Sequence, residues 1–311
     1  MSGTPLWKAI LIEHRLPFRY QKLVGKYIGK YIGKYIRNNI FVKIRKSKSF
    51  DINPNADCEI HSLICHRDLD MYLIAIKSFL YYHDDVSVIV HNDGSLTMND
   101  ISLLNHNIHG IKIINNGEAE KTVIKYLYGK HECISLRKRN IVSAQLFDYI
   151  ILAKKKKIIS LDADIIFTEK PTEVIDWIKD KDTKDCMFNY EEAIGFSKHV
   201  RKMGLELNGN INGGFICFFS DSINYNLVEK SLVKAGKYAK EYVIVQIMID
   251  LCLSQSDKYI FKSLPNDQYI VYFGETKEDM KKAKMVHFVA HLRYAQTHYV
   301  RFFNNFLKKI K

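Results

Sequence analysis

Hydrophobic and polar positions alternate regularly along residues 57–167. Short apolar runs of strand type are each followed by a stretch in which apolar residues recur every three or four positions, as on one face of a helix. The apolar runs cover residues 58–65, 86–93, 111–116 and 157–161, and the helical stretches cover residues 68–82, 97–106, 118–128 and 141–153. This alternation predicts an α/β fold with a mostly parallel sheet between layers of helices. Ligands of such sheets bind beyond the carboxyl ends of the strands.

The second half of the chain is patterned less regularly. Strands are predicted at residues 185–190 and 213–219 and within residues 285–294, and helices at residues 223–236 and 241–253. We expect one catalytic domain over residues 57–294, a basic extension over residues 1–50 and a basic amphipathic tail over residues 295–311.

Positive charge is concentrated in the extension. Of the net charge of +13, residues 1–50 contribute +11, from twelve Lys or Arg and one acid. Within them, "GKYIGKYIGKYIR" at residues 25–37 repeats every four residues, so a helix would align its lysines in one stripe. Its glycines cost about 1 kcal/mol each relative to alanine, and an anionic membrane surface could supply the missing stability. A solvated arm is an equal alternative. No nucleic acid is expected, because the body adds no matching basic surface.

The tail has an amphipathic pattern of its own. A helix over residues 301–311 would place five apolar side chains on one face, namely Phe302, Phe303, Phe306, Leu307 and Ile310. This face either contacts a membrane or packs on the body.

Six cysteines lie far apart without a Cys-x-x-Cys pair, which argues for reduced thiols in a reducing compartment. The first twenty residues lack the apolar region of a signal peptide, and no window reaches the ~18 apolar residues of a membrane span. We expect a cytoplasmic protein, with peripheral contact at the inner face of a membrane.

Asp-x-Asp triplets occur three times, at Asp68 and Asp70, Asp162 and Asp164, and Asp180 and Asp182. The last pair lies in a charged turn, and the first opens a predicted helix, where N-capping explains it. The middle pair follows one apolar run and precedes another, with no basic residue within the run. Two close carboxylates in an apolar setting require a cation, and Mg²⁺ or Mn²⁺ suits oxygen ligands. Capping of local amides is the alternative.

A run of four lysines at residues 154–157 precedes the same strand. A strand rises about 3.3 Å per residue, which puts these lysines at the opposite edge of the sheet from the aspartates. We expect them to end the preceding helix, where cations suit its C-terminal dipole.

Three segments, "LDADIIF", "NGNINGGFICFF" and "VHFVAHLRY", follow one another at spacings of roughly 50 and 75 residues. In order and spacing they resemble the motifs of family 8 of the GT-A glycosyltransferases, the glycogenin-like and lipopolysaccharide galactosyltransferase-like group. The resemblance covers about residues 57–294. It implies a Rossmann-like GT-A fold and metal-dependent transfer of a sugar from a nucleotide sugar, with UDP expected, to a glycan or lipid-linked acceptor, with retention.

The resemblance also implies roles for individual residues. Asp162, Asp164 and His287 would bind Mn²⁺ or Mg²⁺. Gln246 matches a glutamine near the anomeric carbon, and Arg293 matches a lysine that contacts the diphosphate.

Further residues are candidates for catalysis or for binding the substrates. Asn212 matches a residue that faces the donor sugar, and we assign it, together with Gln246, to catalysis. The candidates for substrate binding, besides Arg293, are Gly213, Gly214, Asn189, Glu191 and Arg137.

The sequence departs from the family pattern at several positions. Ala290 replaces a glycine, Tyr294 replaces a tryptophan, a proline is missing, and Val245 replaces the acid before the glutamine. Where the helix before the aspartates normally carries Lys or Arg, this chain has Gln145, with Arg137, Lys138 or Arg139 as substitutes. These departures indicate a divergent member and leave the donor open.

Two other functions stay open at this point. HAD phosphatases also place Asp-x-Asp after an apolar strand, but with Thr or Val where this chain has Ile166, and their later acidic motif is absent. The alternative from another class is a non-catalytic protein that binds a membrane surface or nucleic acid through its basic arm.

Overall fold

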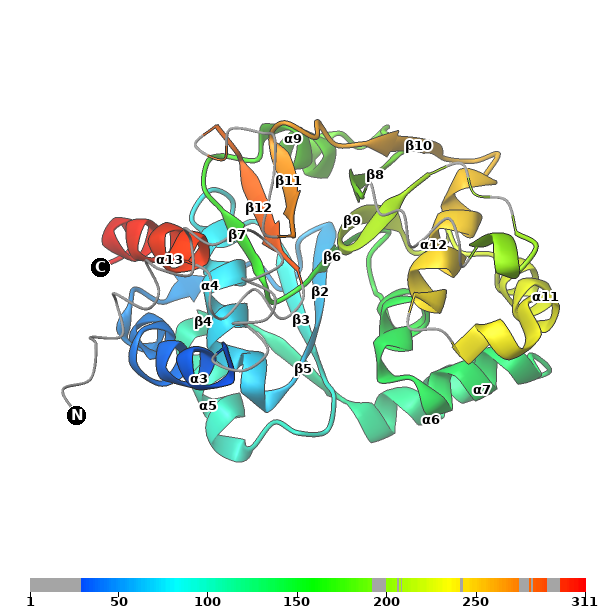
Figure 1. The fold of residues 1–311 in the computed structure, drawn as a ribbon, viewed down its shortest axis with the longest axis horizontal. Helices are drawn as coiled ribbons and strands as arrows, with labels where there is room; N and C mark the ends of the chain where they lie inside the picture. Colours follow the sequence, from blue (N-terminus) through cyan, green and yellow to red (C-terminus); the bar gives the residue numbers. More distant parts are fainter. Residues whose placement is uncertain are drawn as a thin grey trace.

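A seven-stranded sheet runs through the centre of the molecule (Figure 1). The structure is a computed structural model that describes residues 29–191, 200–205, 207, 209–240, 243–273, 280, 282–289 and 297–311. The strands lie in the order β10 (Ile260–Ser263), β8 (Asp185–Tyr190), β9 (Ile211–Phe219), β6 (Lys157–Leu161), β2 (Cys58–Ile64), β3 (Ser87–Asn92) and β5 (Lys112–Asn115). All neighbours pair in parallel except β9, which is antiparallel to both β6 and β8. The mostly parallel α/β sheet predicted from the alternation is confirmed.

Two smaller sheets accompany the central one. β11 (Tyr269–Tyr272), β12 (Met285–Phe288) and β7 (Ile165–Phe167) form a three-stranded sheet, and β1 (Phe50–Asp51) pairs with β4 (Ile108–His109). β7 and β12 are antiparallel, and His287 on β12 stands opposite Ile165, the residue that follows Asp164. This pairing brings the first and third sequence motifs to the same place, although 123 residues separate Asp164 from His287.

Helices cover both sides of the sheet (Figure 1). One side carries α3 (Gly29–Asn39), α4 (Leu69–Leu80), α5 (Met98–Asn107) and α13 (Thr297–Lys309), and the other carries α6 (Asn116–Tyr126), α7 (His131–Arg139), α11 (Tyr225–Ala235) and α12 (Ile244–Ser254). Shorter elements are α8 (Asp148–Ile151), α9 (Thr172–Lys179) and the 3₁₀ turns η1 (Phe41–Lys46), η2 (His66–Asp68), η3 (Ile141–Gln145) and η4 (Gly236–Lys240).

Some predicted elements differ from those in the structure. The helix predicted over residues 141–153 is the 3₁₀ turn η3 followed by the four-residue α8. Helices α7 and α9 and strands β10 and β11 were not predicted. These elements are short, with four to nine residues, so each shows too few turns or alternations for a periodic pattern to emerge.

The end of the predicted extension belongs to the core. Ile36, Phe41 and Ile44 are fully buried, and the ring of Phe41 packs edge-on against Tyr299 and against Phe303 of α13. The backbone N–H of Lys48 donates to the carbonyl of Ile310 at 3.0 Å, which adds a polar contact between the two segments. Residues 33–50 and the C-terminal helix therefore pack together on α4.

A buried lysine fixes this N-terminal segment to α4. The ammonium of Lys77 donates to the carbonyls of Ile44 and Lys48, to the hydroxyl of Ser47 and to the side chain of Asn107, at 2.6–3.4 Å. Burial lowers the pKa of Lys77 to about 8. Burying an ammonium without partners would cost a large free energy, and these four acceptors compensate that cost.

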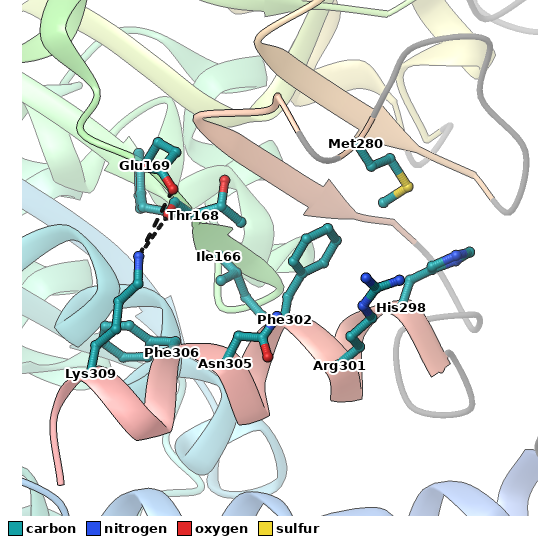
Figure 2. A pocket seen from close by; sticks show the side chains of 11 residues that line it. Ile166, Thr168, Glu169, Met280, His298, Arg301, Phe302, Asn305, Phe306 and Lys309 are labelled. Atoms are coloured by element: carbon teal, nitrogen blue, oxygen red, sulfur yellow. Dashed lines mark hydrogen bonds and ion pairs between the residues drawn. The ribbon is translucent and has the colours of Figure 1, made fainter.

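The C-terminal helix α13 packs its apolar face on the body. Phe303, Phe306, Leu307 and Ile310 are buried, and Phe302 is half-buried over β7 (Figure 2). Of the two alternatives for the predicted apolar face, packing on the body is therefore correct. At the end of the helix the ammonium of Lys309 donates to the carbonyl of Thr168 at 3.2 Å and lies 4.0 Å from the carboxylate of Glu169.

The lysine run does not end the preceding helix as predicted. Helix α8 stops at Ile151, and Lys157 is the first residue of β6. Its buried ammonium donates to the carbonyls of Trp177, Ile178 and Asp180 at 2.6–3.0 Å. Lys157 thus satisfies the carbonyls at the C-terminal end of α9, a helix that follows it in sequence.

Asp250 is buried within α12. Its Oδ2 accepts a hydrogen bond from the backbone N–H of Ile211 at 3.3 Å, which ties α12 to the start of β9. Burial raises the pKa of Asp250 to about 6. An unfolded aspartate titrates near pH ~3.9. The ionised group therefore lowers stability as the pH rises from about 4 to 6, and the loss persists above that range.

We expect Asp250→Asn to raise the free energy of unfolding by up to about 3 kcal/mol at pH 7.5 and by less than about 0.5 kcal/mol at pH 4. The asparagine keeps an oxygen for the Ile211 N–H and removes the buried charge. Urea unfolding of both chains at the two pH values measures the difference. An equal change at both pH values would contradict this explanation.

Candidate metal centre

A cleft of about 650 Å³ opens at the carboxyl ends of β2, β3 and β6. Because β9 is antiparallel to β6, it contributes its first residues to the same edge. The cleft is lined there by residues of the second motif and by Gln246 of α12, and it is closed by His287 and Val289 at the end of β12. This is the edge at which parallel sheets bind ligands.

Asp162, Asp164 and His287, the three predicted metal ligands, come together in this cleft. One ligand atom from each lies within 4.8 Å of the others. Nε2 of His287 is 3.0 Å from Oδ1 of Asp164 and 4.0 Å from Oδ2 of Asp162. Asp164 and His287 are buried, whereas the side chain of Asp162 is 38% exposed, so the cluster opens on one side. Among the described residues, it is the one group of three His, Cys, Asp or Glu side chains whose ligand atoms lie close enough together to hold a metal ion.

The electrostatics of this cluster favour a bound cation. Burial by itself lowers the pKa of His287, but the charge of Asp164 and the hydrogen bond to it outweigh burial, and Asp162 adds to their effect. The net result is a raised pKa for His287. Without a metal ion, a proton on Nε2 supplies the positive charge that two adjacent carboxylates require.

A glycine makes room for the histidine ring. A Cβ at position 214 would lie 2.2 Å from Cε1 and 2.6 Å from Nδ1 of His287, closer than real Cβ contacts. The carbonyl of Gly214 also accepts a hydrogen bond from the backbone N–H of Asp162 at 2.8 Å. Gly214 therefore contacts two of the three predicted ligands.

The other residues of the second motif lie beside the cluster. Asn212 is buried, and its Oδ1 is 2.7 Å from Nδ1 of His287. Its Nδ2 donates to Oε2 of Glu191 at 2.8 Å. The amide of Gln246 donates to the carbonyl of Ile211 and approaches the same Glu191 oxygen at 3.5 Å. Gly213 lines the cleft between Gln246 and Gln145.

Gln145 also contacts Asp162. Its Nε2 donates to Oδ1 of Asp162 at 3.0 Å. This places Gln145 at the site, in the position where the family resemblance leads one to expect Lys or Arg. A neutral amide orients the carboxylate without neutralising it.

Arg137, a candidate for substrate binding, lies inside the protein and away from the cleft. Its guanidinium is 1% exposed and donates to both carboxylate oxygens of Asp148, at 2.6 and 2.8 Å, and to Asn116. Arg137 does not line the cleft. Its charge is used inside the protein, where an unpaired guanidinium would be costly.

Asn189 is also placed differently from the prediction. It lies on β8 opposite Asn212, is fully buried and does not line the cleft. Its side chain has no hydrogen-bond partner among the described residues. Glu191, just beyond the end of the strand, reaches the cleft instead. Arg293 lies outside the described residues.

The sequence interpretation missed the wall formed by η2, where Cys65, Arg67 and Asp68 line the cleft. Asp68 was predicted to cap α4, but its side chain makes no capping hydrogen bond and instead accepts from the guanidinium of Arg67 at 3.1 Å. These residues directly follow the first predicted strand. The rule that ligands bind at carboxyl ends could have identified them.

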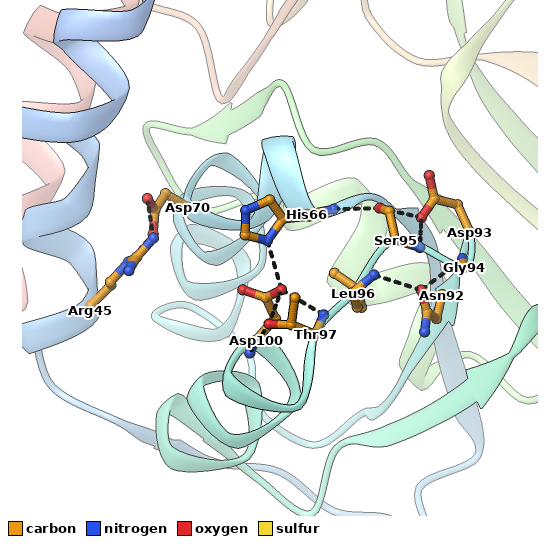
Figure 3. A network of polar contacts seen from close by, with 10 residues as sticks. All are labelled: Arg45, His66, Asp70, Asn92, Asp93, Gly94, Ser95, Leu96, Thr97 and Asp100. Atoms are coloured by element: carbon orange, nitrogen blue, oxygen red, sulfur yellow. Dashed lines mark hydrogen bonds and ion pairs between the residues drawn. The ribbon is translucent and has the colours of Figure 1, made fainter.

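A polar network supports this wall (Figure 3). The backbone N–H of His66 donates to Ser95, and its imidazole lies 2.7 Å from Asp100, which also closes a capping box with Thr97 at the start of α5. The network ties η2 to the loop after β3. Asp93 of that loop also lines the cleft.

Similarity to known proteins is detectable in the structure and not in the sequence. No protein-family model matches the sequence, and no curated protein matches it. The fold is similar to that of the galactosyltransferase LgtC in complex with donor and acceptor sugar analogs, at 12% identity and a TM-score of 0.51, over 81% of this chain and 96% of LgtC. An active-site mutant of LgtC gives a TM-score of 0.53 at 12% identity, with the same coverage.

Mouse xyloside xylosyltransferase 1 in its apo form is similar as well, at 11% identity and a TM-score of 0.50, over 77% of this chain and 98% of that one. At these identities the likeness concerns the fold. The chain has a GT-A glycosyltransferase fold, in a divergent sequence, as the three motifs predicted.

We expect Gly214→Ala to weaken Mn²⁺ binding at least about tenfold, because the added Cβ displaces the His287 ring. Isothermal titration of the purified chain with MnCl₂ measures the affinity.

Gly213→Ala is the matched control. A Cβ there would lie 3.4 Å from its nearest neighbour, Oε1 of Gln246, so the His287 ring should stay in place and Mn²⁺ affinity should be unchanged. Equal affinities for both variants would contradict the packing argument.

Proposed function

We propose that the protein is a metal-dependent glycosyltransferase that moves a sugar from a nucleotide sugar to a glycan or lipid-linked acceptor. The observation that carries the proposal is the convergence of Asp162, Asp164 and His287 at the carboxyl edge of a GT-A fold. The fold alone would not specify an activity. The site adds the chemistry that nucleotide-sugar transfer requires.

The three side chains of the cluster are suited to binding a divalent cation. Two carboxylates and one imidazole are hard and intermediate ligands, which suit Mn²⁺ and, with substrate phosphates and water, Mg²⁺. A cation held there would neutralise the negative charge that develops on a nucleoside diphosphate as it leaves. Because Asp162 is partly exposed on the cleft side, the site has an open side for a diphosphate.

The remaining residues would bind and orient the donor. Gln246 and Gly213 line the cleft next to the ligand cluster, where the family resemblance places the donor sugar. Arg293 remains a candidate for contacting the diphosphate. We propose UDP as the nucleotide and retention at the anomeric carbon, both from the resemblance of the three motifs.

The alternative of a non-catalytic protein does not account for this site. A protein acting only through its basic arm needs neither a buried carboxylate–histidine cluster nor a glycine that leaves space for an imidazole. We therefore favour the enzyme.

Asp164→Asn tests the proposed activity. We expect it to lower Mn²⁺-dependent hydrolysis or transfer of the preferred nucleotide sugar at least about 100-fold, because about 3 kcal/mol of transition-state stabilisation depends on the metal. A panel of UDP-, GDP- and CMP-sugars assayed with Mn²⁺ or with EDTA identifies the donor.

Asp182→Asn is a matched control, since Asp182 belongs to another Asp-x-Asp triplet and is exposed on the turn before β8. It should retain wild-type turnover. If no nucleotide sugar is bound or turned over by the wild-type chain, the proposed function is wrong.

We propose in addition that the protein contacts an anionic membrane through its basic ends at the cytoplasmic face. None of the helices that the described residues form is long and apolar enough to cross a bilayer. The apolar face of α13 is buried, so the contact would be mainly electrostatic. Exposed lysines on the adjacent η1 and α13 include Lys43, Lys46 and Lys308.

Replacing Lys43, Lys46 and Lys308 with Gln should weaken binding to phosphatidylserine vesicles roughly 100-fold at low salt, since each basic residue near such a surface contributes about 1 kcal/mol. Vesicle cosedimentation measures the effect. The control replaces Lys121, Lys125 and Lys130, which lie on and next to α6 on the other side of the sheet (Figure 1). Equal losses in both variants would contradict a specific basic surface.

A further inference from the structure

The side chains of Glu191, Asn212 and His287 form a continuous hydrogen-bonded chain that ends at the candidate metal centre. Each link has a fixed donor and a fixed acceptor, which can be worked out from chemistry. We propose that Glu191 is a positioning residue that, through Asn212, fixes which nitrogen of His287 faces the metal. The inference rests on the metal role proposed above.

The orientation of the Asn212 amide is determined by its two neighbours. The backbone N–H of Gly214 can only donate, and it points to Oδ1 at 3.0 Å. The ionised carboxylate of Glu191 can only accept, and it meets Nδ2 at 2.8 Å. Rotating the amide by half a turn would set donor against donor and acceptor against acceptor. In a residue that is only 3% exposed, water cannot compensate that mismatch.

The amide in turn determines the protonation of His287. Its Nδ1 lies 2.7 Å from the same Oδ1, an acceptor, so Nδ1 must carry the hydrogen. A neutral imidazole protonated at Nδ1 has its lone pair at Nε2. Nε2 is the atom that faces Asp162 and Asp164. The hydrogen bond on the far nitrogen of a metal-bound histidine commonly selects the ligating nitrogen in this way.

The carboxylate that starts the chain is itself held in place. Besides Asn212, the amide of Gln246 approaches Oε2 of Glu191 at 3.5 Å. Glu191 therefore links the residue expected near the donor sugar to the ligand of the metal. Oε2 of Glu191 is the oxygen that both amides approach, so the positioning role rests on this one oxygen.

Two substitutions at Glu191 separate positioning from direct chemistry. Glu191→Leu removes the acceptor, and we expect it to weaken Mn²⁺ binding 10- to 100-fold, about the range for such outer partners. Glu191→Gln retains an oxygen that can accept from Asn212, and we expect its Mn²⁺ affinity and kcat to stay within about threefold of wild type. Titration calorimetry with MnCl₂ and nucleotide-sugar turnover are the two measurements.

Three outcomes of the Glu191 experiments would overturn the proposal. If Glu191→Leu binds Mn²⁺ as the wild type does, the chain of hydrogen bonds does not support the metal centre. If both variants lose turnover equally while Mn²⁺ affinity is unchanged, Glu191 acts on the substrate by its charge. A rise only in the KM of the nucleotide sugar would likewise assign Glu191 to substrate binding.

A double variant tests whether the links act in series. Asn212→Ala breaks the chain between Glu191 and His287, so Glu191→Leu should cause no further loss of Mn²⁺ affinity in that background. Additive losses would overturn the proposal. Circular dichroism and the unfolding temperature of the metal-free chains verify folding, and the Glu191 pair decides the question if Asn212→Ala does not fold.

Two further variants complete the design. Asp93→Asn removes a charge from the same cleft outside this chain of hydrogen bonds, and it should leave Mn²⁺ affinity unchanged. A loss equal to that of Glu191→Leu would mean that charge alone matters. Asp164→Asn separates the two proposals. If it leaves Mn²⁺ binding intact, the metal role is wrong. If it abolishes binding and Glu191→Leu does not, only the positioning role fails.

Discussion

The close approach of two carboxylates to one buried imidazole is the constraint on which this edge of the molecule depends. Asp162, Asp164 and His287 lie within 4.8 Å of one another, in surroundings that screen charge poorly. Holding them there requires the antiparallel pairing of β7 with β12, which brings distant motifs together. It also requires a glycine at position 214, where a side chain would strike the ring. The strand pairing and the glycine are therefore part of the site.

Much of the fold and the centre of the site could be predicted from the sequence. The parallel strands were evident because they are apolar and regularly separated by helices, and Asp162 and Asp164 because they interrupt such a pattern. His287 was identified only through its place in the third motif. Periodicity alone would have assigned it to the core, where it does lie, at 2% exposure.

The rest depended on partners that no local pattern specifies. Arg137 was a candidate for substrate binding, but it is paired with Asp148, and this pairing depends on the placement of α7 relative to α8. Lys157 looked like a C-terminal residue of the helix before it, yet its ammonium reaches carbonyls of a later helix. Glu191 is a similar case, because the role proposed for it depends on its hydrogen bond with Asn212, 21 residues further along the chain. Charges whose partners are set by tertiary packing cannot be assigned from sequence alone.

The packing of η1 against α13 has a consequence for the order of folding during synthesis. Phe41 leaves the ribosome before its ring partners Tyr299 and Phe303, which are made about 260 residues later. At roughly 5–20 residues per second, this leaves an apolar surface on the nascent chain uncovered for at least about ten seconds. Residues 33–50 can therefore reach their final packing only after α13 has been translated.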